Sequence, residues 1–283
     1  MLQVNKSKIN HSTILDELLT GSGVVVIKQV YSLSNINKAR TVINQYADNQ
    51  EQKESHFNAE AESSNKIHLQ QRVWNLFPKD NIFCDLISHN LIFELMSKFL
   101  GTDFICGSYC ASRLLPGSVG QELHIDYPYW DFYKSETFPM GLNSSFPQNC
   151  QVTIPLDNCS EESGATGYIP GSQKTLHYPT DKDDFSDLHQ MIAQPGDLVF
   201  FNGNCWHGAM PNKSNHQRAA LLIEFLPKYI KPVEDLVSYL DIDFKKNCSD
   251  RVQQLLGFKY SYPKMMDVSS TVNDIGIGYK GKK

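Results

Sequence analysis

The segment from Phe104 to Phe225 consists of short apolar runs interrupted repeatedly by proline and glycine. Examples of these interruptions are Pro116-Gly117, Pro170-Gly171 and Pro195-Gly196. Short strands at near-regular spacing, with turn residues between them, are typical of an all-β sandwich or barrel. A jelly roll is one way to close such a sheet. The segment therefore predicts a mainly β core of the jelly-roll kind.

Helical patterns lie on both sides of this core. Apolar residues at helical spacing predict helices over residues 12–19, 34–46, 82–100, 233–240 and 252–256. Ser34 can cap the second of these helices. The short apolar run Val24–Ile27 predicts a buried strand, and the polar stretch 48–66, which has no periodicity, is expected to be a loop.

A length of 283 residues is within reach of one β-rich domain. We therefore expect a single domain over residues 1–283, without internal repeats. Its predicted parts are a helical N-terminal support (1–103), the β core (104–227) and a helical C-terminal extension with a tail (228–283).

The charge of the chain bears on its partners. A formal net charge of −5 and a pI near 6.0 argue against a surface for nucleic acid or anionic membrane, where Lys and Arg would cluster. The single dense basic run is the tail 280–283. The apolar run near the N-terminus, 24–27, is too short for a signal peptide or a membrane span. We therefore expect a cytoplasmic protein without a nucleic-acid or membrane partner, and the sequence leaves its oligomeric state open.

The cysteines favour reduced thiols. There are seven of them, an odd number, and no Cys-x-x-Cys pair. Cys106 and Cys110 could ligate zinc on a helix, but the residues around them favour a strand. A structural zinc site also needs four ligands, so we disfavour zinc here.

His124 and Asp126 are two positions apart, and on a strand residues i and i+2 face the same side. Both can then reach one metal ion, although so short a motif also arises by chance at the edge of a sheet. His207 follows a Pro-Gly turn and an apolar strand that would carry it to the rim of a sheet, and Arg218 follows in turn. Two histidines and one carboxylate are the ligands of non-haem Fe(II) oxygenases, and a guanidinium suits a co-substrate carboxylate. The joint pattern predicts an iron-dependent oxygenase.

With their flanking segments, these residues resemble the phytanoyl-CoA dioxygenase (PhyH-like) family of Fe(II)/2-oxoglutarate-dependent oxygenases. The resemblance covers most of residues 20–230. The matching segments are Gly23–Ile27, His124-Ile125-Asp126, Ser163–Ser172, Pro195-Gly196-Asp197, and His207 with Arg218. The resemblance implies a double-stranded β-helix, a cupin-like jelly roll, with flanking N- and C-terminal helices.

The resemblance also implies roles for single residues. His124, Asp126 and His207 would bind Fe(II) and form the catalytic centre. Arg218 would grip the far carboxylate of 2-oxoglutarate, with O₂ as the other co-substrate. The carboxylate of Asp126 disfavours halogenation, because iron halogenases of related fold have a small residue at that position to admit chloride.

Two further positions match residues that help to hold 2-oxoglutarate in similar proteins, namely Gln121 and Thr166. A solvated loop residue and a turn residue are the structural alternatives for these two. The chain departs from the family pattern at Gln173, where a histidine is frequent, and at Ala209, where some members have a hydroxyl. Neither departure removes a metal ligand.

The segment after Asp126 bears on the substrate. It contains the aromatic run 127–133 and continues to Gln148 with proline interruptions. Long loops beside a site are commonly lids or binding loops, so we predict that Tyr127 and Trp130 contact the substrate. The alternative is that these rings pack the insertion onto the core. The aromatic run suits an apolar or planar molecule, and the lack of a dense basic surface for coenzyme A phosphates favours a free small metabolite or natural-product intermediate.

The predicted reaction is hydroxylation of an unactivated C–H bond as a tailoring step in secondary metabolism. Desaturation, epoxidation and ring closure are alternative outcomes of the same chemistry. Two other classes stay open: a non-catalytic barrel that binds metal and 2-oxoglutarate, and a cupin-type metalloenzyme that needs no oxoacid.

Overall fold

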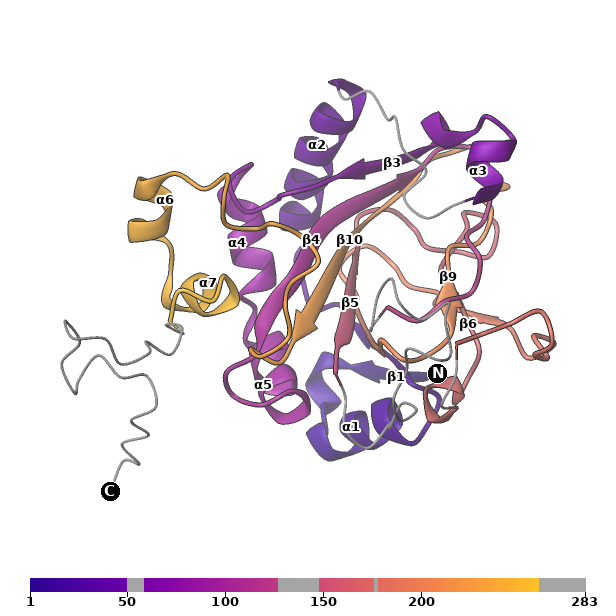
Figure 1. Ribbon diagram of the computed structural model, residues 1–283, viewed down its shortest axis with the longest axis horizontal. Helices are drawn as coiled ribbons and strands as arrows, with labels where there is room; N and C mark the ends of the chain where they lie inside the picture. The colour runs from indigo at the N-terminus through magenta and orange to yellow at the C-terminus, as the bar shows by residue number, and fades with distance from the viewer. Residues whose placement is uncertain (50–58, 127–147, 176–177, 260–283) are drawn as a thin grey trace, which may run out of the picture.

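The computed structural model describes residues 1–49, 59–126, 148–175 and 178–259 (Figure 1). Within these ranges the strands form a seven-stranded major sheet and a three-stranded minor sheet. In spatial order the major sheet contains β1 (Leu2–Asn5), β2 (Val24–Lys28), β8 (Leu198–Asn202), β5 (Cys150–Pro155), β10 (Arg218–Leu226), β4 (Ile105–Leu114) and β3 (Gln70–Val73). The minor sheet contains β7 (His189–Gln190), β6 (Gly167–Tyr168) and β9 (His207–Gly208). This arrangement is the predicted double-stranded β-helix.

Helices cover the major sheet on the side away from β6 and β9 (Figure 1). They are α1 (His11–Leu19), α2 (Leu33–Asn49), α4 (Asn81–Ile87), α5 (Asn90–Phe99), α6 (Ile242–Asn247) and α7 (Asp250–Leu255). The short helix α3 (Ala59–Ser63) lies apart from them, on the β9 side in Figure 1. Short 3₁₀ turns are η1 (Lys6–Lys8), η2 (Ile67–Leu69) and η4 (Ser172–Lys174). Among the helices of the described ranges, none has the length and apolar composition to cross a membrane.

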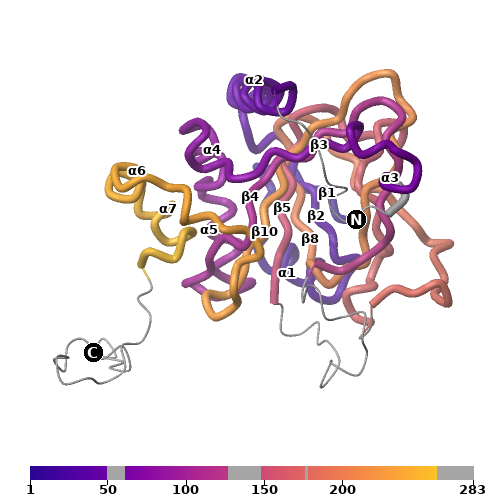
Figure 2. The backbone as a smooth tube through the Cα atoms, turned by 45° about the horizontal axis from the view of Figure 1, so that its top comes forward, coloured from indigo at the N-terminus to yellow at the C-terminus, as the bar shows by residue number. Residues whose placement is uncertain are grey.

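The major sheet divides its side chains between two unlike faces, as β10 shows. Leu221, Ile223 and Phe225 are fully buried in the core that the sheet forms with α1, α2, α4, α5 and α7. Arg218 and Glu224 face the opposite way, because successive side chains on a strand point to opposite faces. Figure 2 shows the neighbouring strands β4, β10, β5, β8 and β2 side by side. The helix side of the sheet is therefore mainly apolar, and the inner side of β10 carries Arg218 and Glu224.

Hydrogen bonds of the Asp197 side chain connect the start of β8 to the end of β2. This side chain is 3% exposed. Oδ1 accepts the backbone N–H of Gln29 (2.9 Å), and Oδ2 accepts the N–H of Gln194 (2.9 Å) and Nζ of Lys28 (3.0 Å). Because β8 leads to the loop before His207, this carboxylate helps to set where that histidine lies.

The predicted helix over 82–100 is wrong in its continuity, because α4 ends at Ile87 and α5 begins at Asn90. Nδ1 of His89 accepts the N–H of Leu91 (3.2 Å) and so caps a new helix. The hydrophobic spacing continues across this break, which hides it from a periodicity argument.

Helix α2 is longer than predicted at both ends. Ser34 lies inside the helix, and the hydroxyl of Ser32 accepts the N–H of Asn35 (3.2 Å) in the capping position. The predicted loop over 48–66 is wrong in part, because its first two residues belong to α2 and residues 59–63 form α3. Residues 50–58 lie outside the described part of the chain. A short polar helix leaves no apolar stripe in the sequence, so periodicity could not reveal α3.

The predicted helix over 233–240 is wrong, since that segment contains only turns and bends. Glu234 explains this. Its carboxylate accepts the N–H groups of Asn75 (2.6 Å) and Tyr109 (2.8 Å) and the hydroxyl of Ser108 (2.9 Å), which holds the segment against β4. The remaining predicted elements are confirmed as α1, β2 and α7.

We predict that Asp197→Ala lowers the free energy of unfolding by about 3 kcal/mol, because it leaves buried backbone N–H groups without an acceptor. Urea denaturation would measure this loss. The control Asp16→Ala, an exposed aspartate on α1, should change stability by less than about 0.5 kcal/mol. Equal effects of the two substitutions would contradict the role given to Asp197.

Candidate metal centre

The structure brings His124, Asp126 and His207 together. His124 and His207 form an isolated antiparallel bridge, in which each backbone N–H donates to the other's carbonyl (2.9 and 3.0 Å). The N–H of Asp126 donates to the carbonyl of Gly203 (3.0 Å) in the loop before β9. One potential ligand atom from each side chain lies within 4.8 Å of the others. Backbone pairing therefore sets the distances between the three groups.

Both imidazoles are oriented by their own backbone. Nδ1 of His124 lies 2.8 Å from the carbonyl oxygen of Glu122, and Nδ1 of His207 lies 2.8 Å from that of Cys205. A carbonyl only accepts, so each Nδ1 carries the hydrogen and the neutral ring has its lone pair on Nε2. The two Nε2 atoms face Asp126, at 3.7 Å for His124 and 3.1 Å for His207. Second hydrogen bonds of this kind hold metal-binding histidines in position.

The pKa values of His124 and Asp126 favour the protonation states that bind a cation. Burial, together with the charge of His207, lowers the pKa of His124 to about 4, so this ring is neutral at neutral pH. Burial alone would lower the pKa of His207, but the Asp126 carboxylate raises it overall. Burial alone would raise the pKa of Asp126, but the two histidines lower it overall. The site thus offers an ionised carboxylate and two imidazoles, a donor set that fits a divalent transition metal.

Gly208 allows the two histidine segments to meet. A β-carbon at this position would lie 2.6 Å from the carbonyl oxygen of Gln121 and 2.8 Å from that of Glu122. Both atoms are backbone and cannot rotate away. The His-Gly pair in the sequence therefore reflects close packing of the chain against the segment that carries His124.

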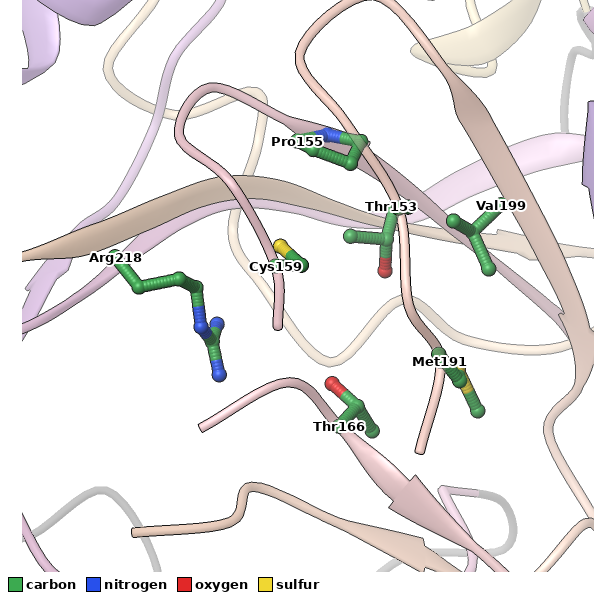
Figure 3. A pocket seen from close by; sticks show the side chains of 8 residues that line it. Thr153, Pro155, Cys159, Thr166, Met191, Val199 and Arg218 are labelled. Atoms are coloured by element: carbon green, nitrogen blue, oxygen red, sulfur yellow. The ribbon is translucent and has the colours of Figure 1, made fainter. Parts of the chain in front are cut away.

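A cavity lies on the inner side of the major sheet, where its lining residue Thr166 directly precedes β6, the strand that pairs with β9 (Figure 3). Its lining residues are Thr153, Pro155, Cys159, Thr166, Met191, Ala193, Val199 and Arg218. Arg218 begins β10 and is 3% exposed. Its Nη2 donates to the carbonyl of Gly164, whereas Nε has no hydrogen-bond partner among the described residues. A buried guanidinium with an unused donor in a cavity fits a carboxylate ligand.

Sequence reasoning missed two residues of this region. Thr153 is a polar residue within the apolar strand β5, and it lines the cavity. Arg72 lies on the edge strand β3, whose polar sequence contains no apolar run that would predict a strand. Its Nη1 lies 3.8 Å from Sγ of Cys110. After burial, which is the largest influence, its positive charge also contributes to lowering the pKa values of His124 and Arg218. The centre therefore has a second cation nearby.

The remaining predicted site residues are Thr166, Gln121, Tyr127 and Trp130. Thr166 lines the cavity, and Gln121 does not belong to its lining. The N–H of Gln121 donates to the carbonyl of Ala209 (2.7 Å), so its backbone lies beside β9. Tyr127 and Trp130 lie outside the described residues and stay predictions.

Comparison with known proteins identifies the family. The sequence profile of the phytanoyl-CoA dioxygenase (PhyH) family matches residues 20–220. The chain belongs to this family. The resemblance predicted from the sequence is thereby confirmed.

Relatives of this chain include fungal dioxygenases. "Dioxygenase ALT11" of Alternaria alternata is 31% identical over 152 residues, which cover 53% of this chain and 47% of that protein. "Multifunctional dioxygenase ausE" of Emericella nidulans is 28% identical over 192 residues, which cover 62% of each chain. The match thus spans about half to three fifths of the length of these relatives.

The fold of this chain matches that of a solved structure. HygX from Streptomyces hygroscopicus, in a crystal structure with nickel and 2-oxoglutarate bound, superposes with a TM-score of 0.61. The match covers 84% of this chain and 94% of HygX, at 14% sequence identity. At this identity the likeness shows the double-stranded β-helix alone.

We predict that Gly208→Ala weakens Mn²⁺ binding by about tenfold or more, because the added methyl group pushes His124 away from His207. Substitutions of residues that support metal ligands weaken metal affinity by this much at other sites. Isothermal titration calorimetry would measure the affinity. Gly167→Ala is a matched control, because Gly167 pairs with Gly208 and its β-carbon would meet mainly the flexible end of Met210. Equal loss in both variants would contradict this account.

Proposed function

We propose that this chain is an Fe(II)- and 2-oxoglutarate-dependent dioxygenase that hydroxylates an unactivated C–H bond of a small-molecule metabolite, in a tailoring step of natural-product biosynthesis. One observation carries the proposal. Two oriented imidazoles and a carboxylate converge within 4.8 Å, and a buried arginine lines a cavity on the inner side of the same sheet. The dioxygenase names of the fungal relatives and the nickel and 2-oxoglutarate of HygX support the same chemistry.

His124, Asp126 and His207 would hold the iron through Nε2, a carboxylate oxygen and Nε2. When bound, iron and 2-oxoglutarate supply O₂ activation, with oxidative decarboxylation of the oxoacid to succinate. The protein supplies coordination geometry, orientation and a site shielded from water. Asp126 fills the position that a halogenase leaves for chloride, so hydroxylation is favoured over halogenation.

Arg218 would bind the far carboxylate of 2-oxoglutarate through its fork of donors. The hydroxyls of Thr166 and Thr153 point into the same cavity and could hydrogen-bond to the oxoacid (Figure 3). Arg72 supplies a second positive charge towards the metal end. The cavity measures about 10 Å³, room for about one water molecule, so entry of 2-oxoglutarate requires movement of a lining side chain. The flexible Met191 is the lining residue best suited to move.

The test of the proposed function is substrate-triggered succinate formation. Anaerobically prepared protein with Fe(II) and 2-oxoglutarate would be exposed to O₂ and a broad panel of metabolites, and succinate would be quantified. We expect some compounds to raise succinate above the uncoupled level and to gain one oxygen atom. Tight binding of iron and 2-oxoglutarate without turnover across the panel would indicate a sensor instead. Unchanged activity of Arg218→Ala would indicate a cupin-type enzyme that needs no oxoacid.

We predict that Asp126→Asn weakens Mn²⁺ binding by about tenfold or more, because it removes the one charged ligand of the centre and even supporting residues at metal sites contribute that much. Electron paramagnetic resonance of free Mn²⁺ would measure the affinity. Glu122→Gln removes an exposed carboxylate two residues before His124 and should leave the affinity within about twofold. Wild-type affinity in Asp126→Asn would refute the ligand assignment.

We predict that Arg218→Lys raises KM for 2-oxoglutarate by about tenfold or more, since a lysine loses the paired hydrogen bonds of a guanidinium to a carboxylate. Uncoupled succinate formation would measure KM. Arg113→Lys is a matched control, because Arg113 is a buried arginine on β4 whose partners are Gln71, Asn44 and Asp48 on the helix side. This control should lower stability without changing KM, and a KM unchanged in Arg218→Lys would contradict the prediction.

A further inference from the structure

The inner face of the major sheet carries a polar cluster at the end opposite to Arg218. Its members are Glu224 on β10, Gln151 on β5 and Asn149, which directly precedes β5. They are 2%, 9% and 0% exposed. Burying polar groups is costly unless they find hydrogen-bond partners. A cluster of this kind is unexpected in a face whose neighbouring positions include Leu222 and Val199.

Two glycines make room for this cluster. A β-carbon at Gly107 would overlap Oε2 of Glu224, and a β-carbon at Gly203 would overlap the carboxamide of Asn149. The register of β4 with β10 shifts next to Glu224, at a β-bulge. Bulges frequently re-aim side chains beside functional sites. The backbone is therefore shaped around these polar groups.

Two sets of contacts link the cluster to the candidate metal centre. Gly203, against which Asn149 packs, accepts the backbone N–H of Asp126 (3.0 Å). Gln151 is the cross-strand neighbour of both Glu224 and Phe201, and the Phe201 ring contacts the ring of His207, with centroids 4.7 Å apart. Adjacent strands are about 4.8 Å apart, so Glu224 lies within about 10 Å of Phe201 across the sheet.

The cluster presents hydrogen-bond acceptors. Nδ2 of Asn149 donates to Oε1 of Glu224 (3.3 Å), which turns the carboxamide oxygen away from that carboxylate. Oδ1 of Asn149 has no hydrogen-bond partner among the described residues, although the side chain is fully buried. The carboxyl group of Glu224 likewise carries oxygen acceptors. A ligand that donates hydrogen bonds would satisfy the Asn149 oxygen, which the described part of the chain leaves unsatisfied.

We propose that Glu224 and Asn149 bind the substrate through a hydrogen-bond donor, an amine or a hydroxyl group, and hold it beside the metal. This inference rests on the proposed function, because it names the substrate class of the same site. It assigns opposite ends of the inner face to opposite chemistries. Arginines meet the carboxylates of the co-substrate, and a carboxylate with an amide meets the donor group of the substrate. The substrate then has a polar anchor in addition to any apolar or planar part.

The first test uses three probes that share one ring, namely cyclohexylamine, cyclohexanol and cyclohexanecarboxylate. Saturation-transfer NMR would measure their binding to the full chain, both unloaded and loaded with Zn²⁺ and 2-oxoglutarate. We expect the amine and the alcohol to bind more tightly than the carboxylate by about tenfold or more, the range of hydrogen bonds to charged groups. Preference for the amine over the alcohol would indicate an ammonium, and the reverse order a hydroxyl. Equal binding of all three probes, or no binding by any, would overturn the proposal.

The second test uses variants. Glu224→Gln should weaken binding of the preferred probe by about tenfold or more, while Glu224→Asp should retain part of it. Glu94→Gln, an exposed carboxylate on α5, is the control and should bind like wild type. Unchanged probe binding in a folded Glu224→Gln variant would overturn the proposal. If that variant does not fold, the probe preference of the wild type still decides.

Calorimetry of Zn²⁺ and 2-oxoglutarate binding distinguishes failure of the proposed function from failure of the substrate assignment. Both ligands should bind Glu224→Gln with affinities within about twofold of wild type, because the substitution lies outside the cofactor site. Failure of the wild type to bind them would contradict the proposed function, whereas the probe preference of the unloaded protein tests the substrate class by itself.

Discussion

The backbone bridge between His124 and His207 is the interaction on which the candidate site depends. Two reciprocal hydrogen bonds join segments that are far apart in the chain. The same segments hold Nδ1 of each ring through a local carbonyl, so the bridge fixes position and the carbonyls fix orientation. Gly208 is required because the segments approach too closely for a side chain there. Backbone pairing thus brings three potential ligands together.

The two faces of the major sheet explain how one fold serves both stability and chemistry. The helix side is mainly an apolar core, which supplies the burial that stabilises the domain. The inner side carries Arg72, Arg218, Thr153 and Glu224, which would be costly to bury without ligands or mutual partners. Because strand residues alternate, each β-strand contributes to both faces. The polar groups are therefore held by the same strands that form the core.

Much of this architecture could be predicted from local patterns. The Pro- and Gly-punctuated runs predicted the jelly roll, and apolar spacing predicted α1 and α7. The errors have a common cause. His89 starts a second helix inside one hydrophobic pattern, and Glu234 holds residues 233–240 against β4 where a helical pattern would otherwise apply. In both places a single polar side chain outweighed the periodicity of its apolar neighbours.

The sequence by itself determined the composition of the candidate centre: a His-x-Asp pair and a later histidine, with an arginine after them, in a chain whose prolines and glycines favour short strands. It could do so because the i, i+2 relation and the ligand preferences of metals are local properties. Only the tertiary structure decided which residues join them. Arg72 and Thr153 reach the site from β3 and β5, and Glu224 and Asn149 meet beside Gly203, because cross-strand register brings them together. Register arises from the packing of the whole sheet, and no short stretch of sequence contains it.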